Sequence, residues 1–283
     1  VTTTLYLIAY IVGFEVLLRM CGASLLWEFG KYAVIFFVIL GLVRENFRVK
    51  IQISISIYFL LLLPSIIHLS IDSFNSWREN VAFNLAGPAC IFFLSNYLNI
   101  KKINNQQLIN LFFFVLLPII SMASVIILKM PNFESYVFTP MSDFTLSGGY
   151  GPNQVSIIFG FMITCFFYAQ IKKNYITSSF ILDVLFIFIF TALGLLTFSR
   201  GGMLAAIISI AIGVSYSFFR GVNKTQFFLK TIFLIILSVF IWYSISSITN
   251  NVIQHRYNIL GESYGDKMVI DLTGRAEIFS TDI

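Results

Sequence analysis

One arginine, Arg200, lies within the segment Thr197-Phe-Ser-Arg-Gly-Gly-Met-Leu-Ala-Ala206, between two long apolar stretches. A charged side chain is costly near hydrocarbon, so in such a place it usually has a function or a partner. The glycines that follow can open a helix, and a helix N-terminus carries free N–H groups and a partial positive charge. Ser199-Arg200-Gly201-Gly202 therefore predicts a phosphate-binding site. The alternative is a short loop whose arginine snorkels to the membrane surface.

The composition indicates an integral membrane protein. Of the 283 residues, 58% are hydrophobic and 11% are charged, whereas a soluble domain carries about 25% charged residues. The 32 Phe residues and the long Ile/Leu runs favour helices. The net charge of +5 gives no argument for nucleic acid, because the basic residues fall in short loops between apolar runs. The lipid bilayer is the partner that this composition predicts.

The apolar runs define the expected architecture. A spanning helix needs about 20 mostly apolar residues, and by this rule the sequence predicts an all-α, polytopic transmembrane bundle of about nine spans. We expect one membrane domain over residues 1–283. The predicted spans are Thr4–Leu18, Trp27–Val43, Ile51–Ile71, Val81–Leu98, Leu108–Leu128, Asn153–Gln170, Phe180–Phe198, Met203–Phe219 and Phe228–Ile248.

The charges in the loops predict the orientation. Of the 18 Lys and Arg residues, ten fall in alternate loops that contain one acid, Glu45, and the other eight share their loops with ten acids. Basic loops face the cytoplasm. Ser199–Gly202, the outer loop 129–152 and the segment 250–283 are therefore expected on the outer face.

Three polar features are thus predicted to meet on one membrane face. Gly151-Pro152-Asn153 ends the outer loop and suits the start of a helix. The predicted helices after Asn153 and Gly202 both begin outside, so their positive dipole ends face one compartment. The common target of arginines and helix N-termini is an anion, most often a phosphate.

The sequence lacks the motifs of nucleotide-sugar, nucleotide, dinucleotide and zinc sites. The sequence has no Asp-x-Asp pair, and Gly261-Glu-Ser-Tyr-Gly-Asp-Lys267 fails the P-loop pattern. Gly149-Tyr-Gly151 lacks the third glycine of a dinucleotide fingerprint. No His/Cys cluster predicts zinc, and Cys21, Cys90 and Cys165 are far apart. We expect neither a metal nor a cofactor, and a lipid-linked phosphate or diphosphate in the outer leaflet suits the site.

Three motifs in order resemble the bacterial O-antigen polymerase and O-antigen ligase family. Ser199-Arg-Gly-Gly202 before an apolar helix resembles its hallmark, and Gly151-Pro-Asn153 is similar to its preceding motif. Thr273-Gly-Arg275 before an aromatic resembles the opening of its large periplasmic loop. The resemblance covers roughly Leu146 to Phe279, and it makes 250–283 the start of that loop.

The resemblance implies a metal-independent glycosyltransferase of the bacterial inner membrane, active on the periplasmic face. Such enzymes transfer an oligosaccharide from undecaprenyl diphosphate to an acceptor glycan, which is another lipid-linked repeat or the lipid A core. Arg200 and Arg275 would bind the diphosphate and stabilise the leaving group. Ser199, Gly201, Gly151 and Asn153 would line the substrate site. A chain-length regulator is a further implied partner.

The family places a histidine or acidic general base later in its loop, and the sequence ends before that point. His255 precedes the Thr-Gly-Arg motif and does not match, so we expect a fragment of a longer chain with the base beyond residue 283. Polymerase is preferred over ligase, although no residue separates the two. The alternatives of other classes are a flippase or solute transporter, which should show broken helices in matching halves, and a noncatalytic scaffold.

Overall fold

A computed structural model describes residues 2–22, 28–47, 50–64, 66, 74–99, 101–172, 174–219 and 224–258. Within these ranges every regular element is helical. The chain forms two compact units: unit 1 contains Val1–Leu128 and Phe161–Ile187, and unit 2 contains Lys129–Gly160 and Phe188–Ile283. The expected all-helical class is therefore confirmed for the described residues.

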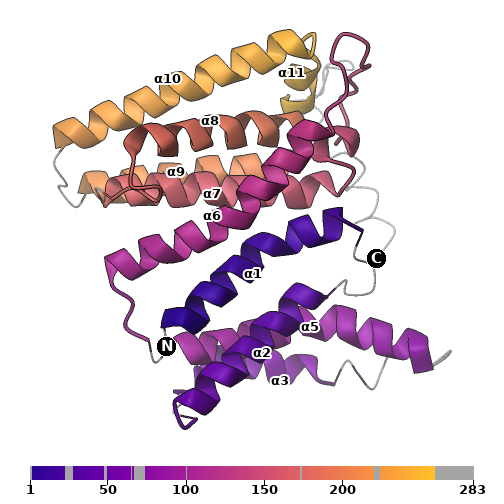
Figure 1. The fold of residues 1–283 in the computed structure, drawn as a ribbon, viewed down its shortest axis with the longest axis vertical. Coiled ribbons are helices and arrows are strands. Elements are labelled where there is room, and N and C mark those ends of the chain that lie inside the picture. The colour runs from indigo at the N-terminus through magenta and orange to yellow at the C-terminus, as the bar shows by residue number, and fades with distance from the viewer. Residues whose placement is uncertain are drawn as a thin grey trace, which may run out of the picture. The chain divides into compact units, whose positions relative to one another are not determined.

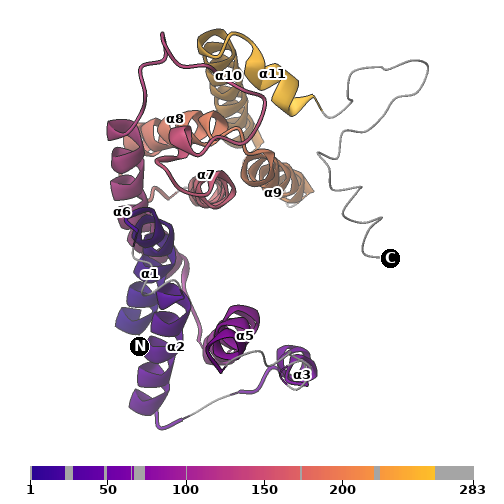
Figure 2. The same cartoon turned by 90° about the vertical axis from the view of Figure 1, so that its right-hand side faces the viewer.

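Unit 1 is a series of packed helices. They are α1 (Thr2–Met20), α2 (Phe29–Arg44), α3 (Ile53–Leu62), α5 (Phe74–Leu98) and α6 (Asn105–Leu128). Helix α1 lies between α6 and α2 (Figure 1). Helix α5 in turn contacts both α2 and α3 (Figure 2). The core of this unit forms where apolar side chains of α1 and α2 meet around the buried Val38 and Tyr97.

Close packing of α1 on α6 depends on one glycine. A Cβ atom at Gly13 would clash with the backbone carbonyl of Val115 and with the ring of Pro118. The missing side chain therefore allows the two helices to approach at the point where α6 contains its proline. In an apolar environment such close contacts supply the packing energy that holds helices together.

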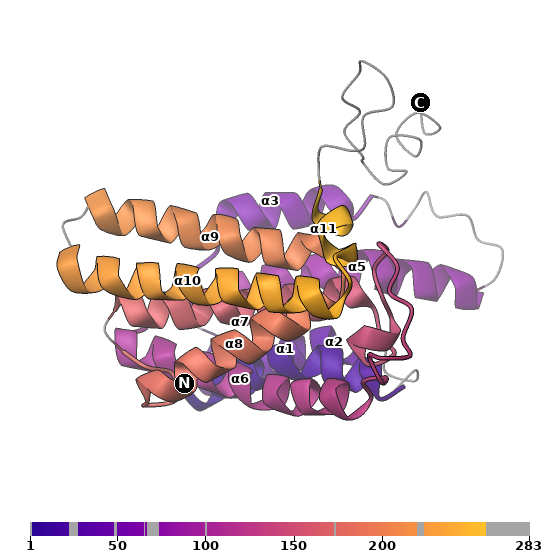
Figure 3. The same ribbon diagram turned by 90° about the horizontal axis from the view of Figure 1, so that it is seen from above.

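Unit 2 contains the segments with the predicted polar motifs. Its elements are η2 (Thr145–Ser147), α9 (Arg200–Phe219), α10 (Lys224–Ile248) and α11 (Val252–Tyr257), with parts of α7 (Pro152–Ile171) and α8 (Phe180–Leu196). The N-terminal ends of α7 and α9 lie at the same end of this unit as α11 (Figure 3).

Helices α7 and α9 pack backbone against backbone. A Cβ atom at Gly202 would clash with the carbonyl group of Ser156, and one at Gly160 would clash with the carbonyl oxygen of Gly202. Ser156 and Gly160 are four residues apart on α7, as Gly202 and Ala206 are on α9. Small residues at this spacing let two helices approach closely. Gly202 is therefore a packing residue, and its neighbour Gly201 is exposed.

The expected count of nine spans is not met. Each predicted span contains a helix, but within the described ranges only six helices are long and apolar enough to cross a membrane. These six are Thr3–Met20, Asn80–Leu98, Asn105–Leu128, Pro152–Ile171, Arg200–Phe219 and Thr231–Ile248. Helices α2, α3 and α8 have 16, 10 and 17 residues. For α8, the predicted span to Phe198 runs into the turn that ends the helix at Leu196.

The α7–α9 contact predicts a difference between two adjacent glycines. Gly202→Ala forces the two backbones apart, and we expect it to destabilise the protein by about 1–3 kcal/mol, as overpacking does. Gly201→Ala is the matched control, because a Cβ atom there meets nothing within 4 Å. Melting temperatures in detergent measure both. Equal melting temperatures for the two variants would contradict the close approach.

Candidate functional site

A buried turn, Thr197–Ser199, joins α8 to α9. The Thr197 hydroxyl donates to the carbonyl of Gly194 at 2.7 Å and accepts the backbone N–H of Ser199 at 3.1 Å. Phe198 between them has a φ of +53°, the left-handed region that non-glycine residues seldom adopt. All three residues of the turn are buried. The turn ends α8 and sets Arg200 as the first residue of α9.

The loop of residues 129–151, which precedes α7, contacts this turn. The backbone N–H of Asp143 donates to the carbonyl of Thr197 at 3.0 Å. The Asp143 carboxylate accepts a hydrogen bond from the Tyr136 hydroxyl at 2.6 Å and another from the N–H of Leu146 at 3.0 Å. The ring of Phe138 stacks on that of Phe198, with 6.3 Å between centroids. Asp143 is therefore a structural residue that holds the loop against the α8–α9 turn.

The loop then leads into α7 through two glycines. Gly148 and Gly149 have φ values of +73° and +83°, which glycine adopts without steric cost. The Gly151 carbonyl accepts the N–H groups of Gln154 and Val155 in the first turn of α7. Gly151 therefore caps the first turn of α7. The sequence predicts that the Gly-Pro-Asn segment starts a helix, and this contact is part of that role.

Asn153 and Ser199 connect the N-terminal ends of α7 and α9. The Ser199 hydroxyl donates to Oδ1 of Asn153 at 2.7 Å. One turn further along α7, the Ser156 hydroxyl donates to the carbonyl of Ser199 at 3.0 Å. Two of the predicted motifs, 46 residues apart, are thus joined directly. The positive ends of two helix dipoles lie together at this point.

Helix α11 closes on the same turn. Nε of Arg256 donates to the carbonyl of Phe198 at 2.8 Å, and the Tyr257 hydroxyl donates to the carbonyl of Ser199 at 3.4 Å. Burial raises the pKa of Tyr257, although the charges of Arg256 and Arg200 act in the opposite direction. The phenol therefore stays neutral at physiological pH and keeps its donor hydrogen, and Arg200 lies close enough to interact with it electrostatically.

Arg200 is half-buried, and no hydrogen bond or ion pair to its guanidinium exists in the described part of the chain. The two helix N-termini, Arg200 and the nearby Arg256 make this end of unit 2 electropositive. An oxyanion is the ligand that such an arrangement binds, because five N–H donors of an arginine form a planar fork that matches phosphate geometry.

The structure brings Arg200, Ser199 and Asn153 together, with Gly201 exposed on the first turn of α9. Arg275 and its Thr-Gly-Arg motif lie outside the described residues. Arg256 and Tyr257 are neighbours of this site that no motif in the sequence indicates. Their signal in the sequence is weak, since Arg256 and Tyr257 follow the last apolar run by eight and nine residues and match no motif. Within the described ranges, His, Cys, Asp and Glu form no group of three suited to a metal.

Comparisons with protein-family models, with curated proteins and with solved structures found no match. For the residues that the structure describes, the fold defines an all-helical protein with six candidate membrane-spanning helices. An electropositive site lies where two of these helices, α7 and α9, begin.

The Ser199–Asn153 hydrogen bond predicts an energetic coupling between the two helix N-termini. We expect a double-mutant cycle of Ser199→Ala and Asn153→Ala to give a coupling of about 0.5–1.5 kcal/mol, the usual net value of such a bond. Reversible unfolding in mixed detergent micelles measures it. The matched control pairs Ser199→Ala with Gln154→Ala, where additive effects are expected. An additive result for Asn153 as well would contradict the bond.

Proposed function

We propose that the protein is an integral-membrane glycosyltransferase of the O-antigen polymerase and ligase type. In this proposal it transfers an oligosaccharide from undecaprenyl diphosphate to another lipid-linked repeat unit, on the periplasmic face of the bacterial inner membrane. The observation that carries the proposal is the position of Arg200 at the adjoining N-termini of α7 and α9, fixed by the Ser199–Asn153 hydrogen bond.

The chemistry of the transfer requires such a site. When the glycosidic bond to the diphosphate breaks, negative charge develops on the leaving phosphate, and oriented donors stabilise that charge. Each helix N-terminus contributes roughly half a positive charge, and Arg200 contributes a bidentate cation. Arg275 is the second arginine of the proposal, with the role that the family resemblance gives it. In this proposal the transfer uses no metal.

The transporter alternative receives less support from the helices. A transporter of lipid-linked sugars or solutes typically has helices broken near the bilayer midplane. Pro88 and Pro118 are the prolines inside described helices, and α5 and α6 each continue through theirs. Among the helices of unit 2, the polar contacts between segments gather at the ends of α7, α9 and α10. This distribution favours chemistry at a membrane surface.

The test compares surface-polysaccharide length in cells that lack the full-length gene and carry a variant copy at equal expression. We expect Arg200→Ala and Arg275→Ala to lose long chains, with about a 100-fold or larger fall in transfer rate, because one stabilising donor is worth that much. Arg200→Lys should restore only part of the ladder, since lysine keeps the charge without the planar fork.

Arg44→Ala is the control, because it removes an equal charge from an exposed position at the end of α2 in unit 1. A null strain with single repeat units on its core supports polymerase. A null strain with bare core and accumulated lipid-linked polymer reassigns the protein as ligase. A wild-type ladder from both alanine variants refutes the diphosphate site and puts the transporter first.

A further inference from the structure

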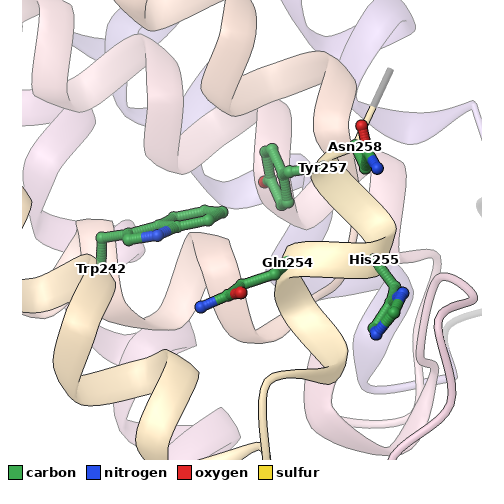
Figure 4. Close-up of a pocket in the computed structure, with 5 residues that line it drawn as sticks. All are labelled: Trp242, Gln254, His255, Tyr257 and Asn258. Atoms are coloured by element: carbon green, nitrogen blue, oxygen red, sulfur yellow. The ribbon is translucent and has the colours of Figure 1, made fainter. Parts of the chain in front are cut away.

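A pocket of about 460 Å³ lies between the end of α10 and α11 (Figure 4). We call it the α10–α11 pocket. Its lining is Trp242, Gln254, His255, Tyr257 and Asn258. Sites for small molecules typically have about 300–1,000 Å³, with aromatic walls and a few polar groups that fix orientation. The α10–α11 pocket has a volume in this range and combines aromatic with polar side chains.

Two aromatic rings form one wall of the pocket. Trp242 and Tyr257 point toward each other in Figure 4, with 5.2 Å between ring centroids and an interplanar angle of 88°. The edge of one ring therefore meets the face of the other, a favourable geometry for aromatic pairs. Trp242 remains partly exposed in this arrangement. A large flat ring held rigidly at the side of a pocket is a platform for a ligand with an apolar face.

Hydrogen bonds within the chain fix the amide of Gln254. Its Nε2 donates to the hydroxyl of Ser246 at 2.8 Å and to Oδ1 of Asn251 at 3.3 Å. The Ser246 hydroxyl is itself held, because it donates to the same Oδ1 at 2.9 Å. With both donations directed into the chain, Oε1 of Gln254 accepts no hydrogen bond from the described residues. It is therefore an oriented acceptor for a hydroxyl group of a ligand.

The same helix connects the pocket to the electropositive site. The ring of Tyr257 lines the α10–α11 pocket, whereas its hydroxyl reaches the carbonyl of Ser199, the residue before Arg200. Arg200 acts electrostatically on the same tyrosine, so Tyr257 lies between the aromatic wall and the electropositive site. The pocket therefore suits a molecule with an apolar face and a hydroxyl group, to which an anion can be attached.

We propose that the α10–α11 pocket binds one pyranose ring of a glycan. The C–H face of the sugar lies on Trp242, and a sugar hydroxyl donates to Oε1 of Gln254. The placement of this sugar next to the diphosphate rests on the function proposed above, whereas the binding of a pyranose does not. An acyl chain fits less well, because Gln254, His255 and Asn258 would lose hydration without gaining hydrogen bonds.

Tryptophan fluorescence tests the binding. The chain has three tryptophans, so the full-length protein with Trp27→Phe and Trp77→Phe reports on Trp242 alone. The probes are methyl pyranosides of the common hexoses and N-acetylhexosamines, titrated in detergent solution. We expect a saturable change in emission with at least one sugar. Gln254→Ala should raise its Kd about 3- to 10-fold, the usual worth of one hydrogen bond.

Tyr243→Ala is the control in this assay, because Tyr243 is exposed on the same helix and does not line the pocket. We expect its Kd to equal that of the parent. Saturation-transfer NMR on Trp242→Ala gives a second readout, in which the transfer to the sugar should be lost. A linear, unsaturable emission change, or a Kd that Gln254→Ala leaves unchanged, would overturn the proposal.

The polysaccharide assay separates this inference from the proposed function. If Arg200→Ala abolishes long chains while Trp242→Ala restores them fully, the glycosyltransferase proposal stands and the placement of a sugar in the pocket during transfer is wrong. If Trp242→Ala shortens the chains and weakens sugar binding while Arg200→Ala has no effect, the pocket stands and the diphosphate site is wrong. If neither Trp242→Ala nor Arg200→Ala changes the chain length, the diphosphate site and the placement of a sugar beside it are both refuted.

Discussion

Unit 2 depends on the buried turn between α8 and α9. A left-handed φ at Phe198 costs of order 1–3 kcal/mol and persists only where the surroundings impose it. Here the carbonyl groups of Thr197, Phe198 and Ser199 accept hydrogen bonds from three other segments: the loop of residues 129–151, α11 and α7. Together these bonds fix one turn. Because the turn starts α9, they also fix Arg200.

The same turn brings two helix N-termini together, which is electrostatically unfavourable on its own. The partial positive charges of α7 and α9 repel each other, and Arg200 and Arg256 add to that repulsion. The close approach at Gly160 and Gly202 holds the helices there despite this cost. A bound anion would remove the repulsion, so the packing that creates the site also makes it favourable for a negative charge, as the proposed function requires.

The local pattern of the sequence predicts the positions of the helices more accurately than their ends. Every apolar run contains a helix, yet α8 stops at Leu196 although its run continues through Phe198. Hydropathy counts Phe198 as part of a span because the residue is apolar. The structure buries that ring in a turn, against Phe138, and the helix ends there. A count of spans from hydropathy therefore exceeds the number of helices long enough to cross a membrane.

The predicted start of α9 at Met203 falls three residues after the observed start at Arg200. The sequence by itself determined the helical class, the start of α7 to within one residue, and the pairing of Ser-Arg-Gly-Gly with Gly-Pro-Asn as anion-site candidates. These features depend on apolar periods and on residues that begin helices, which are local. Only the tertiary structure decided that Gly202 packs while Gly201 is exposed, that Arg256 and Tyr257 join the site, and that Trp242 lines a pocket. Those roles arise from contacts up to 58 residues apart, and side-chain packing rather than local pattern selects such contacts.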